Sequence, residues 1–284
     1  MKKITRGKVR DIYELDDGNL LIVTTDRASA FDVVLPDEIP YKGVVLNRLS
    51  QFWFEMTRDI VPNHLLTTDN SKMPVEFQNE EYEGRCMLVR KLRMVPIECI
   101  VRGFIVGSGW ESYQKNRTIC GIEFLPGLQE AEKIDPIYTP TTKATEGHDQ
   151  HINFEQTVEL LGGNRDLAKQ IRDKSLEIFK RCSSYALTKN IIIADTKLEY
   201  GLDENGDLVL GDELMTPDSS RFWPADKYRL GVSPPSLDKQ FLRDWLKASG
   251  WNKEPPAPHI PKGIIFETAS RYFKIYQTLT GEVF

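Results

Sequence analysis

The sequence predicts an α+β fold in which antiparallel sheets are flanked by helices. Two turn signals, Asp17-Gly18 and Asn205-Gly206, each separate β-rich runs, which is the pattern of β-hairpins. Other segments space their apolar residues at helical intervals. A chain of 284 residues with 40% hydrophobic residues can bury the core of one large domain or of two closely packed domains.

The composition restricts the class of protein. The formal net charge of −5 argues against a general nucleic-acid-binding protein, whose affinity depends on a basic surface. No apolar run approaches the roughly 20 residues that cross a bilayer, and the start MKKITRGK lacks the apolar core of a signal peptide. We therefore expect a cytoplasmic protein without a membrane partner. The oligomeric state is left open, and a homo-oligomer is compatible with the sequence.

The four cysteines are far apart and show no CxxC spacing. This pattern argues against a zinc site or a disulfide framework and predicts free thiols.

The first predicted hairpin lies near the N-terminus. Folding the β-rich runs on either side of its turn brings Gly7, Lys8 and Arg10 alongside residues 25–27. A glycine beside two cations at a sheet edge can cover the phosphates of a nucleotide. The alternative is a pair of solvated surface cations, and the chain has no Walker A sequence and no GxGxxG protein-kinase loop.

Four helices are predicted from their apolar faces. They span residues 44–60, 164–189, 237–249 and 264–279. Pro62 would end the first helix and Asn164 would cap the second, which should pack beneath the central hairpin. Ser236 would cap the third helix and Gly250 would end it.

A connector is predicted after the strand expected at residues 85–91. Pro96 separates two β-rich runs there, which fits a link between two lobes, divided into residues 1–93 and 94–284. Further on, Arg102 and Ser108 flank a segment in which Gly107 and Gly109 allow backbone amides to approach an anion. A structural turn with a solvated arginine is the alternative.

Residues 121–153 are rich in proline, threonine and glycine, and we expect them to be irregular and either functional or mobile. His148 and His151 lie three residues apart. Because no third soft ligand is near, we do not expect them to bind a metal.

The segment 191–221 organises the rest of the chain. It begins with a β-branched run that favours a buried strand. Asp195, Lys197 and Glu199 then alternate, so on a strand their side chains point to one face.

The turn that follows is expected to place two carboxylates opposite each other. A two-residue type I′ turn would pair Glu204 with Asp207 and would put Glu199 directly opposite Asp212. Facing carboxylates are destabilising without a cation between them, and hard oxygen ligands suit Mg²⁺. The alternative is a solvated hairpin, and a register slip of one residue would turn Asp212 to the other side.

A polar loop, TPDSSR, ends this segment at Arg221. Its guanidinium is suited to binding a phosphate-type group. The motif ADTKLEYG, followed by LGDE and PDSSR, resembles the signature of the SAICAR synthetases. These ligases of the purine pathway use ATP to join aspartate to an imidazole carboxylate ribonucleotide. Matching motifs extend from residue 7 to about residue 245, although Val106 stands where the family usually has a small residue.

The resemblance implies a two-lobed, ATP-grasp or kinase-like nucleotide-binding architecture. Residues 1–93 would form the ATP-binding lobe, and residues 94–284 would carry the metal and ribonucleotide sites. It implies ATP and Mg²⁺ as cofactors. The partners would be small molecules, namely ATP, L-aspartate and carboxyaminoimidazole ribonucleotide, with no nucleic acid.

The same resemblance implies a role for each candidate residue. Contacts with ATP are implied for Gly7, Lys8, Val9, Arg10, Leu92, Met94 and Lys143. Contacts with the other substrates are implied for Arg102, Ser108, Asp149, Asp218, Ser219, Arg221, Lys239 and Arg243. His148 would pair with Asp149 at the aspartate site. Lys239 and Arg243 are expected to be exposed, and two solvated cations are the alternative for them.

Three acidic residues and one lysine would form the centre of the implied site. Glu199 and Asp212 would hold the metal. Lys197 would screen charge near the reacting groups, and Asp195 would position the amine or a metal-bound water. A carboxylate resists attack by an amine, so ATP would first convert it to an acyl phosphate, by a phosphoryl transfer that depends on positioning and charge neutralisation.

Two other classes of protein are compatible with parts of this pattern. A small-molecule or lipid kinase would phosphorylate an alcohol and would need no amine, and a non-catalytic nucleotide-binding protein would release no phosphate. ADP release that requires both aspartate and the imidazole nucleotide would distinguish the ligase from both.

Overall fold

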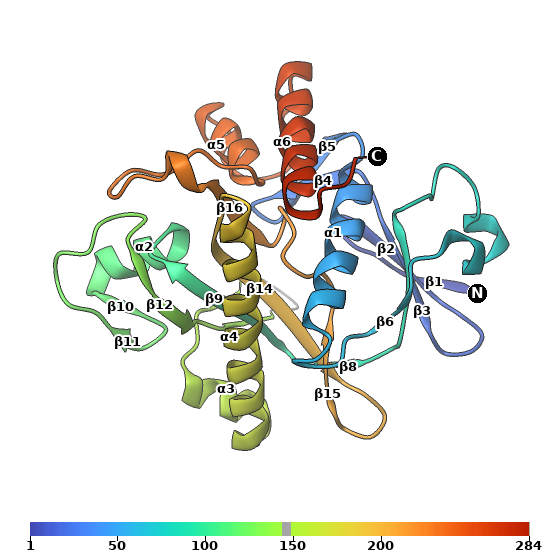
Figure 1. Cartoon of the computed structure of the whole chain (residues 1–284), viewed down its shortest axis with the longest axis horizontal. Helices are drawn as coiled ribbons and strands as arrows, with labels where there is room; N and C mark the ends of the chain where they lie inside the picture. Colours follow the sequence, from blue (N-terminus) through green and yellow to red (C-terminus); the bar gives the residue numbers. More distant parts are fainter. Residues whose placement is uncertain (144–148, 284) are drawn as a thin grey trace.

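The computed structural model describes residues 1–143 and 149–283. It contains two antiparallel sheets with helices packed around them (Figure 1), which confirms the predicted α+β class. In the described residues, no helix is long and apolar enough to cross a membrane. All four cysteines are free thiols, as expected.

The first sheet is built from the N-terminal part of the chain, in the order β1-β2-β3-β7-β6. Its strands are β1 (Lys2–Arg6), β2 (Arg10–Glu14), β3 (Leu20–Thr24), β6 (Leu65–Thr67) and β7 (Cys86–Val89). The predicted hairpin at Asp17-Gly18 is confirmed, since Arg10 pairs with Thr24 and Gly18 adopts a φ of 84°. A positive φ of this kind is what the turn requires of glycine.

The second sheet is centred on the long strand β14, which pairs with β8, β9, β15 and β16. Its strands are β8 (Arg93–Met94), β9 (Ile97–Phe104), β12 (Lys133–Tyr138), β13 (Thr141–Thr142), β14 (Ile191–Leu202), β15 (Leu208–Gly211) and β16 (Ser220–Pro224). Two further ribbons are formed by β4 (Arg27–Ala30) with β5 (Val33–Glu38) and by β10 (Thr118–Ile119) with β11 (Ile122–Glu123).

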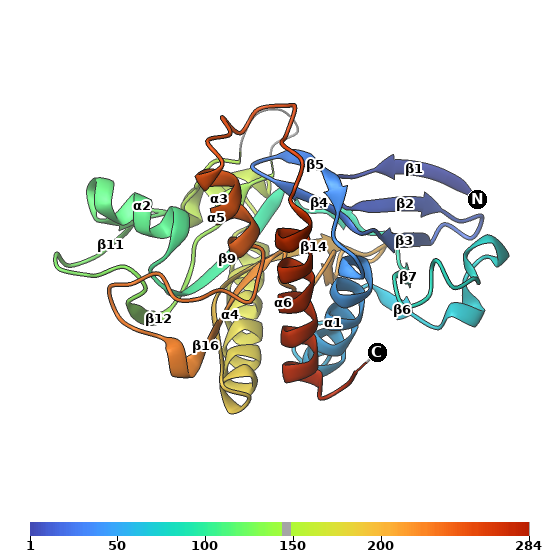
Figure 2. The same cartoon turned by 90° about the horizontal axis from the view of Figure 1, so that it is seen from above.

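The part of the chain that the structure describes forms six α-helices, which surround these sheets. They are α1 (Lys42–Thr57), α2 (Gly107–Asn116), α3 (Phe154–Leu160), α4 (Arg165–Thr188), α5 (Gln240–Ala248) and α6 (Lys262–Thr280). Short 3₁₀ turns occur at Asn70–Lys72, Val75–Phe77 and Ala225–Lys227. Helix α4 covers the central sheet, and α1 and α6 lie beside each other next to it (Figure 2).

One apolar core joins the two sheets. Residues of both sheets pack with α1, α4 and α6 in this core, and Trp53, Tyr200 and Phe222 are fully buried there. A second cluster holds the β4-β5 ribbon against α5 and α6, through side chains such as Leu35 and Leu242. The C-terminal helices therefore fix the position of an N-terminal ribbon. The division into lobes at residue 93 stays a prediction.

The four predicted helices are present, and the ends of each differ from the prediction by one to three residues. Asn164 caps α4, because its Oδ1 accepts a hydrogen bond from the Leu167 amide at 3.0 Å. Helix α1 ends at Thr57, before Pro62 is reached. The prediction that Ser236 caps the third helix is wrong, since α5 begins only at Gln240.

Two helices form where the sequence analysis predicted no helix, and strands form in the segment that it predicted to be irregular. Helix α2 begins within the glycine-containing segment, and α3 begins at Phe154, with Asn153 as its N-cap in a reciprocal capping box. Strands β12 and β13 lie within residues 121–153, so the expectation of an irregular segment is wrong there. These strands are short or interrupted, and pairing with β9 rather than local periodicity stabilises them.

The register of the central hairpin differs from the prediction. Leu202 pairs with Leu208, so the loop spans residues 203–207 and Glu204 does not pair with Asp207. The reason is the side chain of Asp203, whose Oδ1 accepts hydrogen bonds from the amides of both Asn205 and Asp207 at 2.9 Å. Such an Asx-type turn is wider than a two-residue turn.

This wider loop shifts the strand by one residue. Glu199 consequently pairs with Gly211 instead of Asp212. The predicted direct opposition of Glu199 and Asp212 is therefore wrong. Asp212 follows the end of β15 with a φ of 54°, a left-handed conformation that is uncommon for a residue other than glycine.

A matched pair of glycines tests how tightly α1 packs. A Cβ at Gly43 would lie 2.2 Å from the Thr24 carbonyl oxygen, whereas a Cβ at Gly263 would meet nothing within 4 Å. Both glycines are the second residue of their helix. We expect Gly43→Ala to lower the free energy of unfolding by about 1–3 kcal/mol through overpacking, and Gly263→Ala to leave it unchanged or raise it by up to about 1 kcal/mol. Urea denaturation measures both, and equal effects would contradict the packing described here.

Candidate active site

A polar cavity of about 390 Å³ lies where β9, β14 and the start of α5 meet. Many of the residues predicted from the sequence line it together. They are Lys8, Arg102, Ser108, Asp149, Asp195, Lys197, Asp218, Ser219, Arg221, Lys239 and Arg243. The fold thus brings together side chains from the N-terminal turn, the central strands and the C-terminal part of the chain.

Asp195 is held between two arginines at one end of this cavity. Its Oδ2 accepts hydrogen bonds from Arg102 at 3.0 Å and from Arg221 at 2.5 Å. Arg102 also donates to Ser108 Oγ at 2.9 Å and to Thr139 Oγ1 at 3.1 Å, and it is only 2% exposed. The alternative of a solvated arginine is therefore wrong, and two guanidinium groups lie at the wall of the cavity.

The glycines of the neighbouring segment make room for these arginines. A Cβ at Gly107 would lie 2.3 Å from Arg221 Nη2, and a Cβ at Gly109 would lie 3.1 Å from Arg102 Cδ. Val106, which departs from the family pattern, is buried and directly precedes α2. Any larger residue at Gly107 would displace the Arg221 guanidinium.

Lys197 connects two carboxylates in the middle of the site. Its Nζ donates to Glu98 Oε1 at 2.6 Å and to Glu199 Oε1 at 3.1 Å. Burial lowers the pKa of Lys197, but Glu199, Glu98 and Asp212 outweigh this effect and raise the pKa overall. Lys197 therefore stays protonated, as a residue that screens negative charge must.

Glu98 is a site residue that the sequence reasoning missed. Burial raises its pKa, while the nearby ammonium of Lys197 opposes the rise. The local signal for it is its place at the end of the sequence VPIE, residues 95–98, on a strand that pairs with β14.

Glu199 and Asp212 share one region although they are not cross-strand partners. Lys143 forms an ion pair with Glu199, and Arg10 lies 2.7 Å from Asp212 Oδ1. Burial raises the pKa of Asp212, but Arg10, Lys197 and Lys143 outweigh it and lower the pKa. Lys143 and Lys197 thus lie near both carboxylates, and Arg10 pairs with Asp212 alone of the two.

The N-terminal turn is tightly organised. The amide of Gly7 donates to the Arg10 carbonyl at 2.8 Å, and Arg27 donates to the Gly7 carbonyl at 3.1 Å. The Val9 carbonyl accepts from the Thr25 amide at 2.9 Å, and Lys8 pairs with Asp32. Gly7 and Lys8 thus lie alongside residues 25–27, as the sequence predicts.

Leu92 and Met94 lie in the link between the two sheets. Met94 pairs with Gly201 of β14, and a Cβ at Gly201 would lie only 2.6 Å from Leu92 Cβ. Gly211 faces the same two side chains. Met94 is 40% exposed, so it presents an apolar surface next to the site.

A buried cluster surrounds Asp218 at the other end of the cavity. Lys239 and Lys42 both form ion pairs with Asp218 Oδ2, at 3.0 and 2.9 Å. Lys239 is only 6% exposed, so the expectation that it is exposed is wrong. Lys42 was missed because the sequence shows it only as the start of a helix.

Two predicted residues come from the segment after β13. Asp149 lines the cavity. His148 lies outside the described residues. Among the residues that the structure describes, no group of three or more His, Cys, Asp or Glu side chains could hold a metal ion by itself. A metal at Glu199 and Asp212 would thus depend on ligands from a substrate or water.

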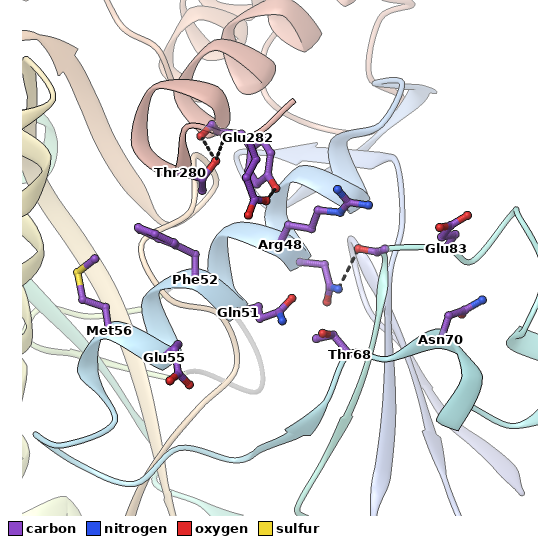
Figure 3. Close-up of a pocket in the computed structure, with 13 residues that line it drawn as sticks. Arg48, Gln51, Phe52, Glu55, Met56, Thr68, Asn70, Glu83, Thr280 and Glu282 are labelled. Carbon is purple, nitrogen blue, oxygen red and sulfur yellow. Dashed lines mark hydrogen bonds between the residues drawn. The ribbon is translucent and has the colours of Figure 1, made fainter. Parts of the chain in front are cut away.

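A separate pocket of about 670 Å³ lies between α1, the end of α6 and residues 68–84 (Figure 3). Arg48, Gln51 and Phe52 project into it from α1, and Thr280 and Glu282 close it from the C-terminal side. None of the predicted site residues that the structure describes lines this pocket.

The fold and the cavity define a class of protein first. Paired guanidiniums, a charged lysine between carboxylates and a glycine turn with cations suit an enzyme that acts on several phosphorylated or carboxylated substrates at once.

Comparisons with known proteins then specify the family. The model of the SAICAR synthetase family matches residues 3–258. A phosphoribosylaminoimidazole-succinocarboxamide synthase of Methylococcus capsulatus is 54% identical over 98% of this chain and 94% of its own length. The synthase of that name from Chromobacterium violaceum is 49% identical over 99% of both chains.

Solved structures agree with the sequence matches. A SAICAR synthase from Saccharomyces cerevisiae, complexed with SAICAR, superposes with a TM-score of 0.90 at 42% identity, covering 100% of this chain and 96% of that chain. A SAICAR synthetase in complex with ADP superposes with a TM-score of 0.73 at 29% identity, covering 99% of this chain and 98% of that chain.

The chain belongs to the SAICAR synthetase family. Members of this family ligate aspartate to carboxyaminoimidazole ribonucleotide with ATP in purine biosynthesis, so the chain is an ATP-dependent carbon-nitrogen ligase. Membership of this family argues against the two alternatives from the sequence, a small-molecule or lipid kinase and a non-catalytic nucleotide-binding protein.

The buried His64 behind Asp212 gives stability a pH dependence. Burial lowers its pKa from 6.5 to about 4, against the opposing effect of Asp212. Between these pH values the unfolded chain binds a proton that the folded chain does not, so stability falls as pH falls. The unmodified protein should therefore lose free energy of unfolding between pH 7 and pH 4. We expect His64→Gln to reduce this loss by up to about 3 kcal/mol.

Denaturation at several pH values measures this effect. The control is His259→Gln, which changes an exposed histidine next to Asp37. If the unfolding free energy depends on pH equally steeply in the His64 variant and in that control, the pH dependence does not come from His64.

Proposed function

We propose that the cavity binds carboxyaminoimidazole ribonucleotide and L-aspartate, that ATP binds next to it, and that the two substrates are joined through an acyl phosphate. The observation that carries this proposal is the position of Lys197 between Glu98 and Glu199, beside the arginine pair that holds Asp195. It is supported by relatives whose structures contain SAICAR and ADP.

The ribonucleotide is assigned to the arginine end of the cavity. Arg102, Ser108 and Arg221 offer donors there, and Asp195 holds both guanidiniums in a fixed orientation. Planar guanidiniums bind carboxylates and phosphates through paired hydrogen bonds. Ser219 and Asp149 line the same cavity and complete the set of polar contacts.

ATP is assigned to the surface between residues 1–93 and the central sheet. The Gly7-Lys8-Val9-Arg10 turn would cover its phosphates, with Lys143 as a further cation. Leu92 and Met94 pack against Gly201 and Gly211, and the exposed part of Met94 would contact the base together with Leu92. In the structure Lys143 and Arg10 are paired with Glu199 and Asp212, so each would exchange a carboxylate for a phosphate.

Mg²⁺ fits the carboxylates of Glu199 and Asp212. Both are hard oxygen ligands, and the cations now balancing them show that the region attracts positive charge. Two protein carboxylates suit an ion that takes its other ligands from phosphates and water. When bound, Mg²⁺ would neutralise the negative charge that develops on the transferred phosphoryl group.

The protein residues then act by holding charge and orientation. Lys197 remains protonated and screens the imidazole carboxylate from the phosphates, so that the two anions can approach. The carboxylate oxygen attacks the γ-phosphorus of ATP, and ADP leaves. The amine of aspartate next attacks the acyl carbon, phosphate leaves, and the amine gives up a proton. We assign Asp195 to orient this amine or a metal-bound water.

Replacing the two metal ligands tests this assignment. We expect Glu199→Gln and Asp212→Asn to reduce Mg²⁺-dependent ADP release by at least about 100-fold, because charge stabilisation in the transition state is lost. The fold should persist, since neither change removes volume. The assay measures ADP release with ATP, aspartate and the ribonucleotide together, and with each one omitted.

The matched control is Glu204→Gln, at an exposed acidic residue of the same hairpin. Near-normal ADP release in both Glu199→Gln and Asp212→Asn would rule out the proposed metal site. Steady-state ADP release at the same rate with and without aspartate in the unmodified protein would contradict the amide-forming reaction.

A further inference from the structure

Asp218 has three partners at its corner of the cavity. The ammonium groups of Lys42 and Lys239 lie 2.9 and 3.0 Å from its Oδ2, and Tyr272 donates a hydrogen bond to its Oδ1 at 2.7 Å. Burial raises the pKa of Asp218, but the two lysines outweigh this effect and lower it well below its usual range. The carboxylate therefore stays charged, and the corner contains two cations against one anion.

The two lysines differ in their access to the cavity. Lys42 is the first residue of α1, is 1% exposed and does not line the cavity. Lys239 directly precedes α5 and does line it, together with Arg243 one helical turn further on. One of the two positive charges balances Asp218, so the other is in excess. A buried charge in excess is costly unless a counter-charge approaches it, and here the approach is from the cavity.

We propose that Lys42 is a positioning residue, which neutralises Asp218 from behind and thereby leaves Lys239 to bind an anionic oxygen group of a substrate. This inference rests on the proposed function, which supplies such substrates. The group is a carboxylate or phosphate oxygen, which both L-aspartate and the ribonucleotide carry. Kinetic measurements on each substrate distinguish these two sources.

The pH dependence gives a second signature of the same arrangement. Burial lowers the pKa of Lys239, Asp218 opposes this, and Lys42 and Arg243 lower it further, to about 8. As pH rises through about 8, Lys239 loses its proton, so kcat/KM for the substrate that it binds should fall. Removing the charge of Lys42 should move this fall to higher pH.

Charged and titratable groups face Lys239 from each neighbouring element. They are Asp218 from the loop, Lys42 from α1, Arg243 from α5, Tyr272 from α6 and Asp238 directly before Lys239, with Lys8, Asp32 and Arg221 lining the same cavity. Of the basic side chains in this set, Lys42 is the one that does not line the cavity. Its replacement therefore changes the charge around Lys239 without removing a group that touches substrate.

The test compares Lys42→Met with Lys42→Arg in the complete protein. We expect Lys42→Met to raise KM for aspartate or for the ribonucleotide about tenfold, the scale of one lost contact with a charged group, and to leave KM for ATP within about twofold. The alkaline fall in kcat/KM should move to higher pH. Lys42→Arg keeps a basic group at this position, so KM and the pH at which kcat/KM falls should both return to those of the unmodified protein. Lys274→Met, at an exposed lysine of α6, is the matched control.

Two results would overturn the inference. One is that Lys42→Met leaves KM unchanged for both aspartate and the ribonucleotide. The other is a general loss, in which kcat, all three KM values and the melting temperature change together while the pH profile does not, because that pattern indicates a purely structural role. Failure of the proposed function would appear differently, as an absence of aspartate-dependent ADP release in the unmodified protein.

Discussion

The row of charges on β14 is the constraint on which the rest of the site depends. Asp195, Lys197 and Glu199 share one face of a largely buried strand. Charges taken out of water are tolerated only when they are paired and hydrogen bonded. Each of the three consequently needs partners from other parts of the chain. The pairing of β9 and β16 with β14 and the course of the PDSSR loop bring these partners to one place.

The same pairing explains how the site can accept charged substrates. Cations already lie against the carboxylates that we assign to a metal, and carboxylates hold the arginines that we assign to the ribonucleotide. Substrate binding then exchanges one counter-charge for another, instead of placing a charge in an empty apolar cavity. Exchange of this kind keeps donors oriented before the reaction, which is the main requirement of phosphoryl transfer.

The sequence predicted local features well and long-range ones only through the family resemblance. Alternation identified the charged face of β14, and a capping residue located the start of α4. The hairpin register was wrong because the Asp203 side chain accepts two backbone amides, a competition that a turn signal does not reveal. Glu98 and Lys42 were missed because each meets its partner only after distant elements pack, and local periodicity contains no record of that packing.

A crystal structure with Mn²⁺ and a non-hydrolysable ATP analogue tests the central claim most directly, because anomalous scattering locates the ion without reference to the protein model. The account predicts an ion within about 2.1–2.2 Å of oxygens from both Glu199 and Asp212 and from the triphosphate. It also predicts that Lys143 has moved from Glu199 to a phosphate. An ion bound away from either carboxylate, with Arg10 and Lys143 still in their present pairs, would contradict it.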